Sequence, residues 1–460
     1  MVRSRRALLL MALLAVLALL ITGIGAAAWA YSRIGRTPGE LIDYSKRRLE
    51  GHPNLELVAL PVLDAVGGWL GEPDKATRAL PFIVPPLPPG VVTAAVGPPE
   101  SGDPMRVLVG PTRSVTSLAL AARSAPDGAV VEVDPGDYVA DVAVWNQRKL
   151  TIRGMGPGVR LLAGGRSAEG KAIWVIRNGD FTVENITFAG GRVADRNGAG
   201  IRLEGGRLVV RQCLFHDNES GILTNAGEDI ELDVENSEFS HNGAGDGQSH
   251  AIYVGAIGRF RLSGSYIHHA NVGHLVKSRA KRNRIEYNRL TDESSGQASY
   301  ELEFPNGGVA EVVGNIVQQG SGTRNSVMLS YGVEGYGWPV NRLAMAHNTL
   351  VNDRRYGGTF VRVAPGAQAV WTRNNLWVGP GRLNLPDAAD SAGDRRAEWP
   401  AFVQPSREDY RLTEAARAAM AGIAPVPPAL APRYEYQHPL RLRPVPDAPL
   451  LPGALQSPLR

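Results

Sequence analysis

The chain has 460 residues, among them 53 glycines and 33 prolines, and its aromatic content is 7%. Its formal net charge is +4 at pH 7, but basic and acidic residues are interspersed. No basic stripe with interleaved aromatic residues occurs, which argues against nucleic-acid binding. The single cysteine, Cys213, excludes an intramolecular disulfide and a CxxC site. Because Cys213 lies in an apolar repeated segment, we expect a small buried side chain there.

The N-terminal segment predicts a membrane anchor. Arginines at positions 3, 5 and 6 precede an uncharged run over residues 7–31. A helix over this run, at about 1.5 Å per residue, exceeds the roughly 30 Å hydrocarbon core of a bilayer. The charges predict a cytoplasmic tail at residues 1–6 and a single-pass inner-membrane protein, with the bulk of the chain on the periplasmic or extracellular side. A cleaved signal peptide is the alternative, since Ala28-Trp-Ala30 resembles a cleavage site.

Two segments connect this anchor to the remainder of the chain. Thr37-Pro-Gly-Glu40 has the composition of a capped helix start, with Pro at the first turn, so we expect a helical juxtamembrane segment over residues 32–80. The proline-rich residues 81–105 predict a semi-rigid linker. Packing of the helices against the following domain is the alternative, and the sequence leaves both open.

One short phrase, a small polar residue followed by an apolar strand, recurs from about residue 150 to about residue 377. Its first residues are Asn185, Gln212, Asn236, Gly264, Asn288, Asn315, Asn348 and Asn374. Subtraction gives steps of 27, 24, 28, 24, 27, 33 and 26 residues. A second short strand, such as Ala251–Val254, lies between most successive copies. Such a period is typical of a solenoid.

Each repeat is too short for a strand and a crossover helix, which need roughly 30 residues or more. The pattern therefore predicts a parallel β-helix whose coils stack about 4.8 Å apart. We expect the recurring asparagine at an internal corner, where its amide bonds to the same group in neighbouring coils.

Two flanking segments have the composition of end caps. Ser114–Arg123 predicts an amphipathic helix, and the turn Pro126-Asp-Gly128, the strand Val130–Val133 and Pro135-Gly-Asp-Tyr138 follow it. At the far end, Asp409–Thr413 predicts a closing strand and Ala415–Met420 a small helix. A helix over the end of a stack covers its apolar surface and blocks edge pairing.

With the repeat, these caps resemble the right-handed parallel β-helix proteins of the pectate-lyase-like superfamily, over roughly Val107 to Leu412. The resemblance implies an all-β fold: a right-handed parallel β-helix over residues 106–412, with helix caps. Residues 413–460 would form the C-terminal cap helix and a tail rich in proline and arginine, lying on the solenoid or disordered.

Polar side chains concentrate between about residues 217 and 336. If Val276 points inward like Leu302, alternation places Lys277, Arg279, Glu301 and Glu303 on one outer face. Tyr253 would stand beside them, one coil back. His250 and His274 are separated by about one coil, so we expect them to stack. The alternative is a solvated cross-strand ion pair between the basic and acidic residues.

A second polar set follows the strands that begin with the asparagine phrase. Four residues after each reference position come His216, Ser240, His268, Asp292 and Gln319, and five residues after come Asp217, His241, His269, Glu293 and Gly320. We expect these side chains to border a groove with the outer patch; structural hydrogen-bond columns are the alternative. No histidine spacing is diagnostic of a metal site. Tyr331, Tyr336 and Trp338 lie in the longest loop and could stack on sugar rings or pin the loop.

The resemblance implies chemistry on uronic acids. Lyases and epimerases of such sugars neutralise a carboxylate, remove the adjacent proton and assist the departing oxygen. Similar β-helix lyases use Lys or Arg on an outer sheet, some with calcium. The candidate catalytic residues are Lys277 and Arg279, assisted by His250, His274 and Tyr253. The candidate substrate-binding residues are Glu301, Glu303, His268, Asp292, Tyr331, Tyr336 and Trp338.

The cofactor is unknown: calcium is compatible with the resemblance, but the sequence has no dense Asp/Glu cluster. We predict a membrane-anchored envelope protein whose partner is an acidic polysaccharide. Lyase cleavage and epimerisation both remain open, as does the alternative of a non-catalytic glycan-binding or protein-binding scaffold.

Overall fold

The computed structural model describes residues 59, 62, 105–293, 296–323, 325–354, 356–446 and 450–457. The chain divides into two units, residues 1–73 with 355–358, and residues 74–354 with 359–460; the three parallel sheets lie in the second unit. Within the described ranges no helix is long and apolar enough to cross a membrane. The predicted tail at 1–6 and anchor at 7–31 lie outside these ranges, as do segments 32–80 and 81–105 apart from residues 59, 62 and 105.

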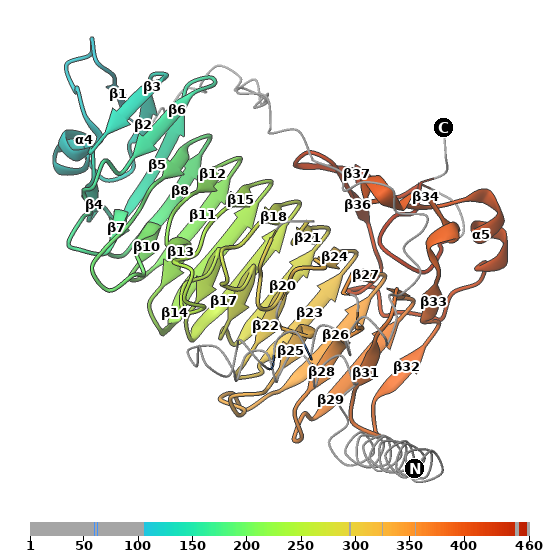
Figure 1. Ribbon diagram of the computed structural model, residues 1–460. Helices are drawn as coiled ribbons and strands as arrows, with labels where there is room; N and C mark the ends of the chain where they lie inside the picture. Colours follow the sequence, from blue (N-terminus) through green and yellow to red (C-terminus); the bar gives the residue numbers. More distant parts are fainter. Residues whose placement is uncertain are drawn as a thin grey trace, which may run out of the picture. The chain divides into compact units, whose positions relative to one another are not determined.

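Short strands stack into three parallel sheets along one axis (Figure 1). Sheet A contains β1 (Arg106–Val109), β2 (Val130–Val133), β5 (Lys149–Gly154), β8 (Asp180–Glu184), β11 (Arg207–Arg211), β14 (Gly227–Glu235), β17 (Ile257–Ser263), β20 (Arg282–Glu286), β23 (Val309–Val313), β26 (Arg342–Ala346), β29 (Ala369–Arg373) and β32 (Asp390–Ala392). Sheet B contains β3 (Gly136–Val139), β6 (Val159–Leu162), β9 (Thr187–Ala189), β12 (Leu214–His216), β15 (Glu238–Ser240), β18 (Tyr266–His268), β21 (Arg289–Thr291), β24 (Ile316–Gln319), β27 (Thr349–Asn352), β30 (Leu376–Val378) and β33 (Arg395–Ala397).

Sheet C contains β4 (Ala143–Trp145), β7 (Ala172–Ile176), β10 (Ala199–Leu203), β13 (Ser220–Thr224), β16 (Ile252–Val254), β19 (Val276–Ser278), β22 (Leu302–Phe304), β25 (Val327–Tyr331), β28 (Thr359–Val363) and β31 (Arg382–Asn384). Each coil passes through sheets A, B and C in turn before the chain returns to sheet A. The architecture is the parallel β-helix that the repeat predicts, of the right-handed type that the resemblance implies.

Like side chains line up inside the stack. The rings of Phe188 and Phe215 are stacked at 4.9 Å, and those of Phe215 and Phe239 at 4.7 Å. These separations match the spacing of paired strands, so each coil buries its apolar face against the next. Cys213 is part of this core, as predicted, and burial raises the pKa of its thiol to about 12.

At the corner between sheets A and B, the column of inward-pointing side chains lies one residue later than the repeat predicted for most coils. Each of these coils turns with a left-handed residue, which is Asn185, Gln212, Asn236, Gly264, Tyr287, Gly314, His347 and Asn374 in successive coils. The side chain of the residue after it points inward and joins a ladder of hydrogen-bonded side chains along the solenoid axis. In this ladder, successive coils contribute Ser265, Asn288, Asn315, Asn348 and Asn375.

The expected internal asparagine is therefore confirmed for three of the residues named from the repeat. Asn288, Asn315 and Asn348 each donate Nδ2–H to the oxygen one coil on, at 2.9–3.0 Å. The expectation is wrong for Asn185, Gln212, Asn236, Gly264 and Asn374, which occupy the left-handed column. Tyr287 conceals the slip, because a bulky aromatic residue is uncommon at a left-handed position.

The N-terminal end is capped by helix α4 (Leu118–Ser124), which the sequence predicted to begin at Ser114. It begins later because Val115 forms a β-bridge with Val109 and Ser117 is the N-cap. The Asp141 carboxylate also accepts hydrogen bonds from the Leu118 and Ala119 N–H groups.

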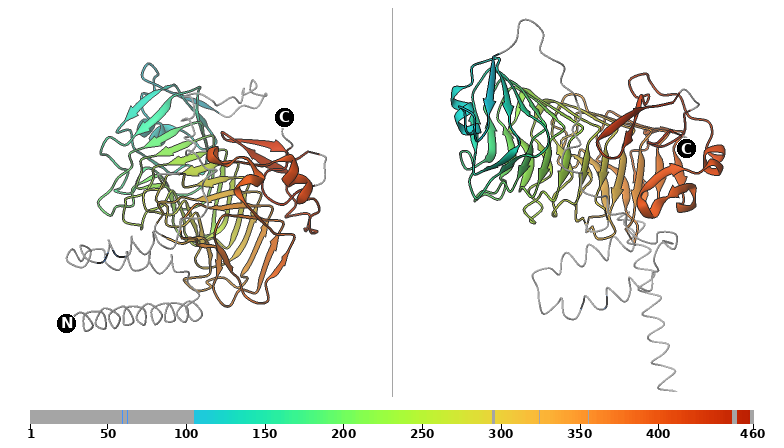
Figure 2. Two further views of the ribbon diagram at one scale, coloured as in Figure 1. Left: turned by 45° about the vertical axis from the view of Figure 1, so that its right-hand side comes forward. Right: turned by 90° about the horizontal axis from the view of Figure 1, so that it is seen from above.

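The C-terminal end has the predicted strand, β35 (Asp409–Leu412), and helix, α5 (Glu414–Ala419, N-cap Thr413). β35 pairs with β34 (Phe402–Gln404) as an antiparallel hairpin, and short 3₁₀ helices lie at Trp399–Ala401 and Pro405–Arg407. The described tail residues form a second hairpin, β36 (Tyr434–Gln437) and β37 (Arg441–Pro444), and pack on the solenoid (Figure 2). The sequence did not predict this hairpin.

Candidate functional site

A column of polar side chains runs along the outer face of sheet C. Strand register aligns Tyr253 of β16 with Lys277 of β19 and Glu303 of β22. Val276 and Leu302 are fully buried and paired with each other, so the predicted inward and outward directions are confirmed for these two strands. The column continues through Ser330 to Arg362, which is exposed.

Lys277 lies between two carboxylates. Its Nζ is 3.2 Å from Glu303 Oε2 on the neighbouring strand and 3.1 Å from Glu334 Oε1. Glu303 is almost fully buried; burial opposes its ionisation, but His274 and Lys277 lower its pKa below the usual value. Glu303 is therefore a carboxylate at neutral pH.

Arg279 contacts both Tyr253 and Glu334, and so links Tyr253 to the carboxylate that pairs with Lys277. Its Nε–H donates to the Tyr253 hydroxyl at 3.0 Å, its Nη1 is 2.6 Å from Glu334 Oε2, and it also donates to the Asn306 side chain. Tyr253 and Arg279 are both half-buried. The phenol oxygen is therefore held beside a cation at the surface of the sheet.

His250 and His274 lie one coil apart with their ring centroids 4.2 Å from each other, as predicted, but the rings are tilted by 35° and not stacked. The His274 N–H donates to His250 Nδ1 at 3.0 Å, and His274 Nδ1 lies 3.1 Å from Glu303 Oε2. Burial lowers the pKa of both rings, for His250 well below the usual value. Both imidazoles are therefore neutral at pH 7, and His250 Nδ1 is occupied as an acceptor.

The loop between β25 and β26, residues 332–341, folds back onto this group. The loop between β15 and β16, residues 241–251, is longer, so the prediction that residues 332–341 form the longest loop is wrong. Glu334 contacts Lys277 and Arg279, and Trp338 donates its Nε1–H to the Arg279 carbonyl at 3.0 Å. The Tyr336 hydroxyl donates to the Ala364 carbonyl at 2.6 Å. Tyr336 and Trp338 therefore pin the loop. Sequence reasoning missed Glu334 and Asn306, because no local pattern brings a loop back onto earlier coils.

Three predicted substrate-binding residues are buried away from the outer face. Glu301 has no exposed surface and accepts a hydrogen bond from Gln319, so its predicted place beside Glu303 is wrong. Asp292 is also fully buried and accepts from the Ala298 N–H and the Thr323 hydroxyl. Burial raises the pKa of both acids well above their usual values. Tyr331 ends β25 within the core, where its hydroxyl donates to the Gly308 carbonyl.

His268 belongs to a different cluster, on sheet B. It stacks on Tyr266 at 3.9 Å, and its Nε2 lies 3.1 Å from Glu238 Oε1. The predicted column slips here as well, since His268 aligns with Thr291 and not with Asp292. Beside Tyr266, the buried Arg289 pairs with Glu408 at 2.5 Å and Glu293 at 3.4 Å. His438 packs edge-on against Tyr266, so the C-terminal hairpin covers this cluster.

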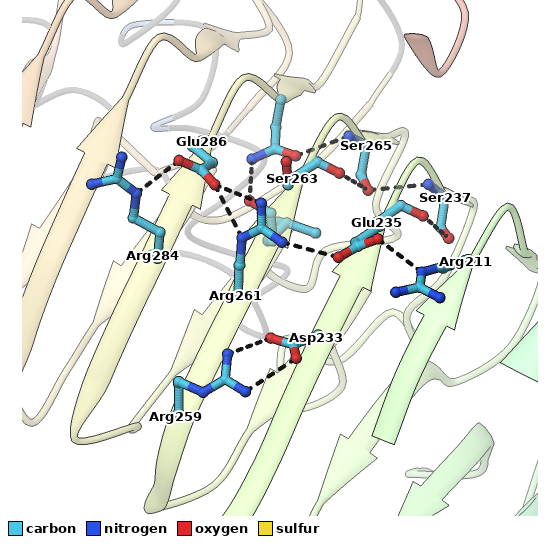
Figure 3. A network of polar contacts seen from close by, with 12 residues as sticks. Arg211, Asp233, Glu235, Ser237, Arg259, Arg261, Ser263, Ser265, Arg284 and Glu286 are labelled. Carbon is cyan, nitrogen blue, oxygen red and sulfur yellow. Dashed lines mark hydrogen bonds and ion pairs between the residues drawn. The ribbon is translucent and has the colours of Figure 1, made fainter. Parts of the chain in front are cut away.

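The outer face of sheet A is a lattice of ion pairs (Figure 3). Glu235 contacts Arg211 and Arg261, each at 2.9 Å, and Glu286 contacts Arg261 and Arg284 at 2.9 and 2.8 Å. A pocket of about 460 Å³ lies between this face and the C-terminal segment. Asp233 of β14 faces Arg261 of β17 with opposite charge, which stabilises the sheet. Arg261 in turn faces Arg284 of β20, and Glu286 pairs with both arginines.

Within the described ranges, no group of three or more His, Cys, Asp or Glu side chains is arranged to hold a metal ion. Glu303 and Glu334, the acids nearest Lys277, are both occupied by ion pairs. The residues present thus give no ligand set for calcium at this site.

Among solved structures, the chain is similar to pectate lyase Pel9A, with 12% identity and a TM-score of 0.51 over 77% of this chain and 97% of that chain. The chain has the pectate-lyase-like β-helix fold. It is also similar to an alginate lyase from Paenibacillus sp. str. FPU-7, with 16% identity and a TM-score of 0.43 over 64% of this chain and 99% of that chain. No protein-family profile and no curated protein matches the sequence. The likeness to Pel9A confirms the predicted fold and shows nothing about the activity of this chain.

Proposed function

We propose that this protein binds an acidic polysaccharide along the outer face of sheet C and acts on it at Tyr253, Lys277 and Arg279. The observation that carries the proposal is the contact network of these residues with Glu303 and Glu334, assembled from three consecutive coils and one returning loop. A surface of stacked coils suits a long, repetitive ligand, because the same strand spacing recurs along the axis.

The groups fit removal of a proton next to a sugar carboxylate. Lys277 and Arg279 are cations on one face, suited to neutralising the carboxylate and the negative charge that develops as the proton leaves. Tyr253, once it has lost its hydroxyl proton to solvent, is the base that takes the proton from the sugar carbon, and Arg279 Nε–H holds its oxygen beside a cation. In a lyase reaction, the bond to the departing oxygen then breaks and that oxygen takes up a proton. In an epimerisation, a proton returns to the opposite face of the same carbon.

Neutral His250 and His274 act in this proposal as positioning residues. His274 lies against Glu303, which holds Lys277. His250 packs against His274 and stacks on Tyr253. The alternative, a non-catalytic binding solenoid, is favoured by the degree to which the cations are already paired.

The test incubates the chain from Pro98 onward with pectate-type and alginate-type polymers. A lyase forms an unsaturated product with ultraviolet absorbance, and an epimerase incorporates solvent deuterium at the sugar carbon. Tyr253→Phe should lower the rate by about 10²–10⁴-fold with little effect on binding, whereas Lys277→Ala should reduce both. The exposed Lys149→Ala is the matched control.

Absence of product and of exchange with every acidic glycan, together with binding that Lys277→Ala does not change, would remove the function from this site. Glycan binding without turnover that is lost in Lys277→Ala would favour the scaffold.

A further inference from the structure

One carboxylate, that of Glu334, bridges both cations of the site. Its Oε1 is 3.1 Å from Lys277 Nζ, and its Oε2 is 2.6 Å from Arg279 Nη1. The two oxygens thus engage two cations from the same strand segment, as the carboxylate of a bound uronic acid would.

The two acids at the site differ in their freedom to leave. The side chain of Glu303 is 4% exposed and lies on a strand within the sheet, whereas that of Glu334 is 42% exposed and lies on a loop. Burial opposes the ionisation of Glu334, but its contacts with Arg279 and Lys277 lower its pKa below the usual value. Glu334 is therefore negatively charged at neutral pH. Two cations and two carboxylates leave no net formal charge to attract an acidic sugar.

The loop does not depend on the Glu334 side chain for its position. Tyr336 and Trp338 hold it through hydrogen bonds to backbone carbonyls, and the Gly308 N–H donates to Asn341 Oδ1 at 2.9 Å. The Glu334 N–H itself donates to the Pro305 carbonyl at 3.0 Å. The carboxylate can therefore rotate into solvent while the loop stays in place.

We infer that Glu334 is an internal competitor of the substrate: its carboxylate occupies the place of the sugar carboxylate and is displaced by it. The inference rests on the proposed function of sheet C. A uronate replaces both lost ion pairs, whereas a neutral sugar replaces neither and binds with Glu334 left in place. Glu334 therefore lowers the affinity of the site for uronates, which bind less tightly than its two cations alone would allow, and leaves the affinity for neutral sugars unchanged.

The test measures binding to the full chain by calorimetry, with oligogalacturonate, oligomannuronate and an uncharged oligosaccharide of equal length. Glu334→Gln keeps the shape of the side chain and removes its charge. Whichever uronate binds the parent chain should bind Glu334→Gln about three- to tenfold more tightly, as expected for loss of two partly exposed competing ion pairs. Affinity for the uncharged sugar should not change. Glu228→Gln, which neutralises another surface acid paired with a lysine, is the matched control.

Unchanged or weaker uronate binding in Glu334→Gln, with binding still lost in Lys277→Ala, would overturn the inference and leave the proposed function standing. Failure of both the parent and Glu334→Gln chains to bind any uronate, at equal thermal stability, would overturn both. Binding by Glu334→Gln alone would support both.

Discussion

Single residues at two buried sites show how this solenoid tolerates charge inside. Arg289 is buried together with Glu293 and Glu408, and the Tyr266 hydroxyl donates to Glu293 at 2.6 Å. His347 has no exposed surface; its Nδ1 lies 3.0 Å from the Leu451 carbonyl and its Nε2 is 3.1 Å from the Asn374 amide. Each group is stable only because the C-terminal segment supplies a partner.

Removal of the Glu408 carboxylate should be strongly destabilising. In Glu408→Ala, the buried Arg289 loses its shortest ion pair and keeps the longer contact to Glu293 and a hydrogen bond to the Thr291 hydroxyl. We therefore expect a loss of about 3–5 kcal/mol in the free energy of unfolding, measured by urea denaturation. Glu228→Ala removes an exposed ion pair and should cost at most about 1 kcal/mol. Equal effects of the two substitutions would show that the buried cluster is not a stability element.

His347 should make the fold sensitive to acid. Burial lowers its pKa from 6.5 to about 4, so the folded state favours the neutral ring. Its contribution is fully present above the unfolded pKa and is lost as pH falls from about 6.5 to about 4, because the unfolded chain then binds the extra proton.

That loss amounts to at most about 3 kcal/mol. Asp292 and Glu301, whose pKa values are raised, act in the opposite direction, so the comparison is with His347→Gln. Between pH 7.5 and 4, unfolding midpoints of the parent chain should fall more than those of the variant. Parallel pH profiles would contradict the assignment.

At the scale of elements, the corner between sheets A and B combines two columns with different tasks. The left-handed column turns the chain, and the following column carries the amide ladder through Asn288, Asn315, Asn348 and Asn375. Each amide in the middle of the ladder donates to one neighbour and accepts from another, so a gap leaves buried groups unpaired.

Asn315→Ala should therefore cost about 1–3 kcal/mol or more of unfolding free energy, because the Asn288 amide and N–H both lose their acceptor. Asn185→Gly, which keeps the left-handed corner and removes the amide bonds to the Gly154 and Gly156 carbonyls, should cost less. Chemical denaturation of both variants measures the difference. A larger effect at Asn185 would contradict the assignment of the two columns.

At the scale of the whole molecule, the predicted anchor at residues 7–31 would hold the protein at a membrane, and the β-helix does not include these residues. We expect the full chain to sediment with membranes and to resist extraction by high salt, because an apolar helix of this length spans a bilayer. A chain that begins at residue 98 should remain in the supernatant with the same β-sheet circular dichroism. Full chain recovered in the supernatant would contradict the anchor, and a chain shortened by about 30 residues would favour a cleaved signal peptide.

The repeat and the strand alternation by themselves determine that the chain forms a parallel β-helix and that Tyr253, Lys277 and Glu303 share an outer face. Both predictions follow from short sequence periods: side chains alternate every two residues along a strand, and equivalent strands recur once per coil. Only the tertiary structure decides that Glu334 returns to Lys277, that Glu301 is buried, and that a C-terminal hairpin covers His268. These contacts depend on where loops and tails of irregular length fold back onto the coils, and no periodic sequence pattern encodes those positions.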